Sequence, residues 1–130
     1  MASEHGTSVT AGPVTFVIEH RTVVQDGSET GGPTVRVLGG EDGHEYLRLD
    51  MFHASPHYHY EPPGEPERVL MLDTDAEGDA VTWGIARLRD RLTPMLVAAG
   101  GREIADALDE STLARAVDDV EALVRNPGPT

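Results

Sequence analysis

The hydrophobic pattern of this chain changes its period at Asp73, and that change constrains the fold more than any other feature. Before Asp73, apolar and polar residues alternate, which is typical of half-buried strands. After Asp73, apolar residues recur every three or four positions, as they do in helices that cover a core. Strands followed by helices predict an α+β fold, with a mostly antiparallel sheet of about five strands and two or three C-terminal helices packed on one face.

Alternation is clearest over residues 14–24, where Val14, Phe16 and Ile18 fall on one face. Further strands are predicted over residues 34–38, 44–52, 57–60 and 68–72. Residues 25–33 are rich in Gly, Ser and Asp and predict a loop. Residues 68–72 are apolar on both faces, which favours a central strand.

A glycine-rich turn over residues 39–43 predicts a hairpin between the second and third of these strands. In the third strand, alternation places Tyr46, Arg48 and Asp50 on the face opposite Leu47 and Leu49. Arg48 and Asp50 would border a pocket or, more simply, form a cross-strand ion pair.

The helical part of the chain holds a short helix over 102–108 and two longer apolar stripes. The first stripe consists of Ile85, Leu88, Leu92, Met95, Leu96 and Ala99, and the last of Leu113, Val117, Val120, Leu123 and Val124. Pro94 either kinks one long helix or stands in the first turn of a second helix capped by Thr93. Ser111 is the expected N-cap of the last helix.

A length of 130 residues fits one domain. Residues 1–12 are small, polar residues and predict a flexible N-terminal arm. Residues 13–126 are expected to form the single α+β domain, and residues 127–130 a C-terminal tail. Small domains of this kind often form twofold dimers, so a homodimer is expected.

Composition excludes several functions. A net charge of −13 argues against nucleic acid and against anionic membranes as partners, but it is compatible with metal ions. The chain has no cysteine and no lysine, so a disulfide, a thiol nucleophile and a Schiff base are all excluded. No apolar run reaches the roughly 18 residues of a membrane span, and the start does not resemble a signal peptide. A cytoplasmic location is expected.

Three of the six histidines lie close together, at His53, His57 and His59. On a strand, His57 and His59 point to the same side, roughly 6–7 Å apart, and two imidazoles at that spacing can converge on one metal ion. His53, just before the break at Ser55-Pro56, would fold back as a third ligand, and Glu61 is the first carboxylate that follows. Glu65 and Glu67 are further carboxylate candidates in the same segment.

This pattern predicts a divalent metal site, with zinc or iron the best-suited ions, held by His53, His57, His59 and Glu61. Three ligands with an open position are typical of a metal-dependent enzyme that acts on a small-molecule substrate. In a first alternative, His57 and His59 are catalytic without a metal, as the acid and base of a lyase, cyclase or isomerase. In a second, the chain is a non-catalytic dimeric accessory protein and the histidines are structural.

Other polar or aromatic features point to structural roles. Tyr58 and Tyr60 would lie on the strand face opposite the histidines and pack in the core. His20 and His44, each near a strand end, are weaker ligand candidates. The acidic run at 73–79 begins like a calcium-binding loop, but its twelfth position is Gly84 instead of a glutamate, so Asp75 or Asp79 is expected to cap a helix.

Arginines and a tryptophan lie in the first predicted helix. Arg87, Arg89 and Arg91 are expected to be surface or interface charges, and Trp83 a core or dimer contact.

Two resemblances accompany the histidine pair. His57-x-His59 resembles the first metal motif of the cupins, but Glu61 comes too soon and no later histidine provides the second motif, so the chain is not assigned to them. Residues 51–64, together with the helix over 83–100, resemble a group of small uncharacterised actinobacterial proteins that carry His-Tyr-His-Tyr. That resemblance implies no particular activity.

Overall fold

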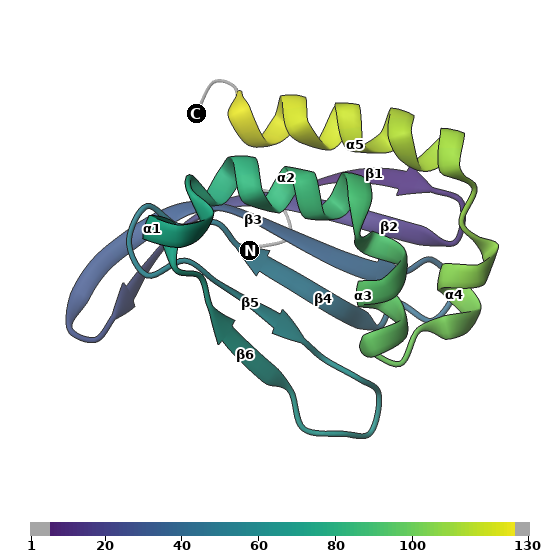
Figure 1. The fold of residues 1–130 in the computed structure, drawn as a ribbon, viewed down its shortest axis with the longest axis horizontal. Helices are drawn as coiled ribbons and strands as arrows, with labels where there is room; N and C mark the ends of the chain where they lie inside the picture. Colours follow the sequence, from purple (N-terminus) through teal and green to yellow (C-terminus); the bar gives the residue numbers. More distant parts are fainter. Residues whose placement is uncertain (1–5, 127–130) are drawn as a thin grey trace.

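The computed structural model describes residues 6–126, and in that range six strands form one antiparallel sheet with sequential neighbours (Figure 1). The strands are β1 (Thr7–Ala11), β2 (Val14–Gln25), β3 (Ser28–Gly39), β4 (Glu45–Asp50), β5 (His57–Tyr60) and β6 (Arg68–Met71). The helices that follow are α1 (Thr74–Glu77), α2 (Ala80–Asp90), α3 (Leu92–Ala98), α4 (Arg102–Ala107) and α5 (Glu110–Arg125). The α+β class and the antiparallel sheet are confirmed, with one strand more than expected and five helices in place of two or three.

The additional strand is β1, which lies in the segment predicted to be a flexible arm. Residues 7–11 pair with β2 along their whole length, and Ala11 is fully buried. The prediction was wrong there because a five-residue strand is too short to display a convincing alternation. Residues 1–5 of the predicted arm and residues 127–130 of the predicted tail lie outside the described part of the chain.

The segment predicted as a loop over 25–33 belongs mostly to β3. Gln25 pairs with Ser28, so Asp26 and Gly27 alone form the turn of a β2–β3 hairpin. Their φ angles of 54° and 78° are the left-handed values that a two-residue type I′ turn requires. Asp-Gly is the sequence signal of such a turn. The glycines that follow it made residues 28–33 resemble a loop, although they belong to β3.

A β-bulge in β4 changes which side chains share a face. Val37 of β3 pairs with Leu47, but Leu38 pairs with Glu45, so Tyr46 is an extra residue on β4. Tyr46 therefore turns into the core, at 6% exposure, instead of joining Arg48 and Asp50 as the alternation predicted. Glu45 takes its place and forms an ion pair with Arg48.

The last strand, β6, lies at the edge of the sheet, not at its centre. It pairs with β5 alone, and Val69 and Met71 are 51% and 61% exposed. The run over 68–72 is apolar on both faces, but only one of those faces is covered. Apolar content alone therefore predicted the wrong position for this strand.

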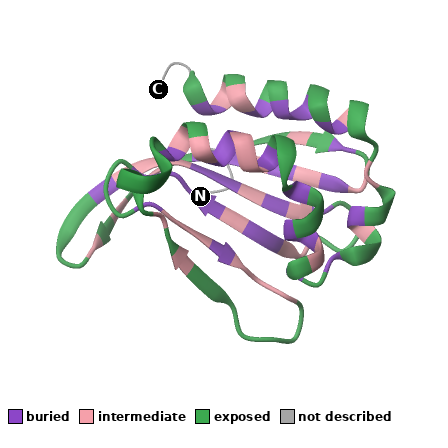
Figure 2. Ribbon diagram, in the orientation of Figure 1, coloured by how far each residue is buried: buried purple, intermediate pink, exposed green. Residues whose placement is uncertain are grey.

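The helices cover one face of the sheet and bury a single core between them (Figures 1 and 2). The sheet contributes to this core mainly Phe16, Ile18, Val35, Val37, Leu47 and Leu49, and the helices mainly Ile85, Leu88, Leu92, Leu96, Val117 and Val120. Pro94 stands in the first turn of α3, so two helices are correct for this stretch, but the expected cap at Thr93 was wrong, because α3 begins at Leu92 and Arg91 is its N-cap. None of the helices in residues 6–126 combines the length and the apolar character that a bilayer crossing requires.

Aspartates cap α2 and α5, two of the helices that contribute to the core. Asp79 accepts the backbone N–H of Thr82 at the start of α2, as the acidic run predicted. Asp109 does the same for Thr112 at the start of α5, so the expected cap at Ser111 was wrong. Ser111 instead donates its hydroxyl proton to Asp109.

Candidate metal centre

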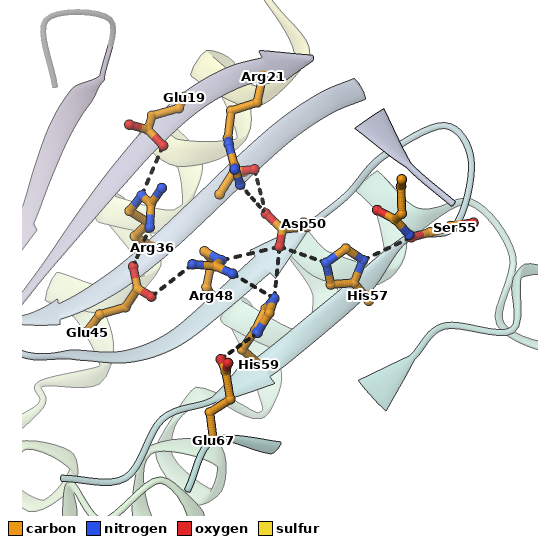
Figure 3. A network of polar contacts seen from close by, with 12 residues as sticks. Glu19, Arg21, Arg36, Glu45, Arg48, Asp50, Ser55, His57, His59 and Glu67 are labelled. Atoms are coloured by element: carbon orange, nitrogen blue, oxygen red, sulfur yellow. Dashed lines mark hydrogen bonds and ion pairs between the residues drawn. The ribbon is translucent and has the colours of Figure 1, made fainter. Parts of the chain in front are cut away.

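The face of the sheet away from the helices carries a network of charged side chains (Figure 3). Alternation puts His57 and His59 of β5 on this face, together with Arg48 and Asp50 of β4. The register pairs His57 with Asp50 and His59 with Arg48. Since cross-strand neighbours lie about 5 Å apart, one carboxylate comes within reach of both imidazoles.

Asp50, His57 and His59 form a three-residue group, in which one ligand atom from each residue lies within 4.8 Å of the other two. His57 Nε2 and His59 Nε2 both lie 3.1 Å from Asp50 Oδ2. The Asp50 side chain is 1% exposed, that of His59 8% and that of His57 14%. The group is therefore almost covered, and His57 is its most accessible member.

The other nitrogen of each imidazole is bound to an acceptor. His57 Nδ1 lies 3.0 Å from the backbone oxygen of Ser55, and His59 Nδ1 lies 2.9 Å from Glu67 Oε2. A carbonyl or carboxylate oxygen can only accept, so both Nδ1 atoms carry a proton and donate it. The Nε2 atoms of both imidazoles face the same Asp50 oxygen, as lone pairs in the neutral rings and as N–H donors in the doubly protonated rings.

Asp50 is held in its ionised form. Thr34 Oγ1 and Arg21 Nη1 donate to Oδ1 at 2.7 and 3.1 Å, and Arg48 Nε lies 3.3 Å from Oδ2. Burial alone would raise the pKa of Asp50, but the Thr34 hydrogen bond and the nearby positive groups hold it below its ordinary value. An ionised carboxylate thus faces two imidazole nitrogens.

Arg48 also contacts the group directly. Its Nη2 donates to His59 Nε2 at 2.9 Å, so the guanidinium already supplies positive charge at one of the two imidazoles. The next arginine along the row, Arg36, bridges Glu19 at 3.0 Å and Glu45 at 2.7 Å. The arginines of this face are therefore matched to carboxylates.

Two residues predicted as ligands lie outside this group. His53 is exposed, and its Nδ1 donates to the backbone oxygen of Gly31 at 2.9 Å. The side chain of Glu61 hydrogen bonds with Glu45 instead of approaching the imidazoles. The weaker candidates His20 and His44 donate to the backbone oxygens of Val124 and Glu61.

Glu61 is in fact poorly suited to bind a metal at neutral pH. Burial, the hydrogen bond with Glu45 and the negative charge of Glu45 raise the pKa of Glu61 to about 8. Glu45, held by the hydrogen bond from Glu61 and the charge of Arg36 against the effect of its own burial, has a lowered pKa. One proton is thus shared by the pair and resides on Glu61.

This shared proton makes stability depend on pH. Between about pH 4.5, the ordinary pKa of the group, and about pH 8, the folded chain binds the Glu61 proton and the unfolded chain does not. The contribution of Glu61 therefore falls as pH rises across that window. We expect Glu61→Gln to be more stabilising, relative to wild type, at pH 9 than at pH 5, as measured by urea unfolding. Glu65→Gln, the same change in an exposed loop, is the control, and equal effects of Glu61→Gln at both pH values would refute the shared proton.

The structure adds to the histidines a residue that the sequence assigned to an ion pair. Arg48 and Asp50, for which a cross-strand ion pair was expected, contact each other within β4 at 3.3 Å. Asp50 pairs across strands with Arg21 of β2 at 3.1 Å and also faces both histidines. The signal was available in part, because Asp50 was placed on one face of a strand adjacent to the histidine strand. What the sequence lacked was the register that sets Asp50 opposite His57.

Two cavities lie elsewhere on the molecule and do not include these three residues. One, of about 870 Å³, is lined by residues of the β1–β2 and β3–β4 turns and by α4. The other, of about 260 Å³, lies between β5 and the helices α2 and α3. The polar group therefore opens on the uncovered face of the sheet and not into either cavity.

Comparison with curated proteins and with solved structures gives no match. A family model does match, over residues 8–124, which span nearly all of the sheet and helices described above. The chain therefore belongs to the family described as domain of unknown function (DUF7700).

Proposed function

We propose that this domain binds one divalent metal ion, zinc or iron, through Asp50, His57 and His59. The observation that carries the proposal is the position of Asp50 Oδ2, which lies 3.1 Å from the Nε2 atoms of both histidines. Neutral imidazoles would there present lone pairs to an ionised oxygen, an arrangement that a bound cation would stabilise. His57 and His59 are the ligands expected from the sequence, and Asp50 replaces His53 and Glu61 as the third.

The distances suit a coordination sphere. With metal–ligand bonds of about 2.1 Å, neighbouring ligand atoms lie roughly 3.0 Å apart in an octahedral site and 3.4 Å apart in a tetrahedral one. Ser55 O and Glu67 are placed as outer partners, because each accepts the Nδ1 proton of a ligand and so fixes its tautomer and orientation.

Two histidines and one carboxylate leave coordination positions for water or substrate. This ligand set occurs in catalytic zinc sites and in non-haem iron sites, so we propose a metal-dependent enzyme that acts on a small molecule. A metal there would lower the pKa of a bound water or polarise a carbonyl group. The side chain of Arg48, 23% exposed beside His59, would move aside on metal binding and could then bind a negatively charged group of the substrate.

One observation favours a second candidate, acid–base chemistry without a metal. Arg48 Nη2 already donates to His59 Nε2 at 2.9 Å, which uses the lone pair that a metal would need. His57, the more exposed histidine, would then act as acid and base, with Asp50 stabilising its imidazolium form and Ser55 O fixing its orientation. An isomerase, lyase or cyclase reaction fits this arrangement.

Metal titration separates the two candidates. We expect purified protein, stripped with EDTA, to bind about one equivalent of Zn²⁺ or anaerobic Fe²⁺ in calorimetry and to melt at a higher temperature when loaded. His57→Ala/His59→Ala should weaken binding at least about a hundredfold, because two of three ligands are lost. His53→Ala is the matched control and should bind as wild type does, since His53 lies outside the group.

Two results would reject the metal proposal. One is a wild-type protein that binds neither ion, and the other is a double variant that binds as tightly as wild type. In the first case, nitrogen-15 NMR of the imidazoles tests the second candidate, which requires that His57 carry protons on both nitrogens when it donates to Asp50. A His57 Nε2 without a proton at every pH would reject that candidate too.

A further inference from the structure

The opposite face of β5 forms part of a small pocket. Because side chains alternate along a strand, Tyr58 and Tyr60 point away from the histidines and toward the helices. They line a cavity of about 260 Å³, whose other walls come from α2 and α3. The residues that line it are Tyr58, Tyr60, Trp83, Arg87, Arg91, Pro94 and Met95.

Aromatic rings form one side of this pocket. The ring centroids of Tyr58 and Trp83 are 4.9 Å apart, with planes inclined at 45°, and those of Tyr58 and Tyr60 are 5.9 Å apart. All three residues are partly buried against the core and keep one surface in the cavity. They give the pocket a rigid apolar wall that matches the flat face of a planar ligand.

Two arginines also line the pocket, and neither is paired with a carboxylate within residues 6–126. In the described part of the chain, the ion pairs of arginine involve Arg21, Arg36, Arg48, Arg89 and Arg125. Arg87 and Arg91 have no carboxylate within 4.0 Å among residues 6–126. The Nε of Arg87 is buried and has no hydrogen-bond partner there, while its guanidinium lies 5.4 Å from the Trp83 ring centroid.

Because the Nε of Arg87 is itself covered by protein, a ligand in the pocket would accept from the other guanidinium nitrogens of Arg87 and from Arg91. No acidic side chain lines the pocket, although the chain as a whole carries a net charge of −13. The pocket is therefore a local positive site in a negative molecule. Two guanidinium groups beside an aromatic wall suit a carboxylate attached to a flat, apolar group.

We propose that this pocket binds a small aromatic carboxylate. The ring of the ligand would pack on Tyr58 and Trp83, and its carboxylate would accept from Arg87 and Arg91. A volume of about 260 Å³ accommodates a single-ring acid but not a nucleotide. The inference does not depend on the metal, because the residues involved lie on the other face of β5.

Trp83 is the only tryptophan of the chain and lines the pocket, so its fluorescence reports occupancy directly. We expect benzoate, added to EDTA-treated protein, to change this fluorescence in a saturable way. Benzamide, its neutral analogue, should bind at least about tenfold more weakly, because it lacks the charge that the arginines recognise. Acetate and inorganic phosphate, which lack the ring, should also bind more weakly.

Variants locate the binding site. Arg87→Gln and Arg91→Gln should each weaken benzoate binding about tenfold or more, with folding checked by circular dichroism. Arg115→Gln, the same charge change at an exposed position of α5, should bind as wild type does. His57→Ala/His59→Ala should bind benzoate normally, whatever its effect on metal binding. The proposal is overturned if benzoate gives no saturable change, if benzamide binds equally well, or if all three arginine variants behave alike.

Discussion

Asp50→Ala is expected to lower the free energy of unfolding by about 3–5 kcal/mol in metal-free protein. Asp50 is 1% exposed and contacts Arg21, Arg48 and Thr34 as well as both histidines. Without its carboxylate, Arg21 and the buried Thr34 hydroxyl lose their partner, and Arg48 keeps only Glu45 and His59. The loss exceeds that of a surface ion pair, because the remaining groups cannot recover full hydration.

Urea unfolding in the presence of EDTA measures this effect without any contribution from metal. Asp50→Asn should fold and show a smaller loss, since its amide oxygen can still accept from Thr34. Asp75→Ala removes the same charge at an exposed position and should change stability by less than about 0.5 kcal/mol. If Asp50→Ala were as stable as Asp75→Ala, the polar face would contribute little to the fold.

Phe16→Ala is expected to destabilise the domain by about 3–5 kcal/mol. Phe16 is fully buried in β2, where the register places it between Val9 of β1 and Val37 of β3. Helix α5 packs on β1 and β2. Truncation would leave a cavity under this helix that the strands, fixed by hydrogen bonds on both sides, cannot collapse to fill.

The size of the void is tested by a second substitution. Phe16→Leu retains most of the volume and should cost less than about 1.5 kcal/mol. Val24→Ala, at a residue that is 75% exposed, should have almost no effect. Chemical denaturation of the three variants measures the series, and a loss at Phe16→Ala no greater than at Val24→Ala would contradict the packing described for β2.

Strands and helices were predicted correctly where the period of the apolar residues matches their burial in the structure, and wrongly where it does not. Alternation at Phe16 and Ile18 located β2, and the helical stripe through Leu88 and Leu96 located α2 and α3. The edge position of β6 was missed because Val69 and Met71 are apolar but exposed. A β-bulge such as that at Tyr46 has no recognisable sequence signal. The sequence therefore could not predict that Tyr46 lies on the core face of the sheet.

The site was predicted to the extent that it is local in sequence. His57 and His59 belong to one strand, and their common face follows from alternation alone. Asp50 reaches them across the gap between two strands, and its contact depends on the register of β4 with β5. The loop between these strands sets that register. Proximity in sequence favoured His53, whose position in that loop directs it instead to Gly31.

Strand β5 has four residues, and each of its two faces supplies a different proposed site. A slip of one residue would turn both imidazoles into the apolar core and both phenol rings to the uncovered face. An insertion or deletion of one residue at Pro56 should therefore abolish both sites in a single event. A slip of two residues would keep each face correct but would set His59 opposite Asp50 and Glu61 opposite Arg48, so that Asp50 would no longer lie opposite His57. The metal site and the aromatic pocket each require the present length of the β4–β5 loop. Engineering of either site must therefore leave that length unchanged.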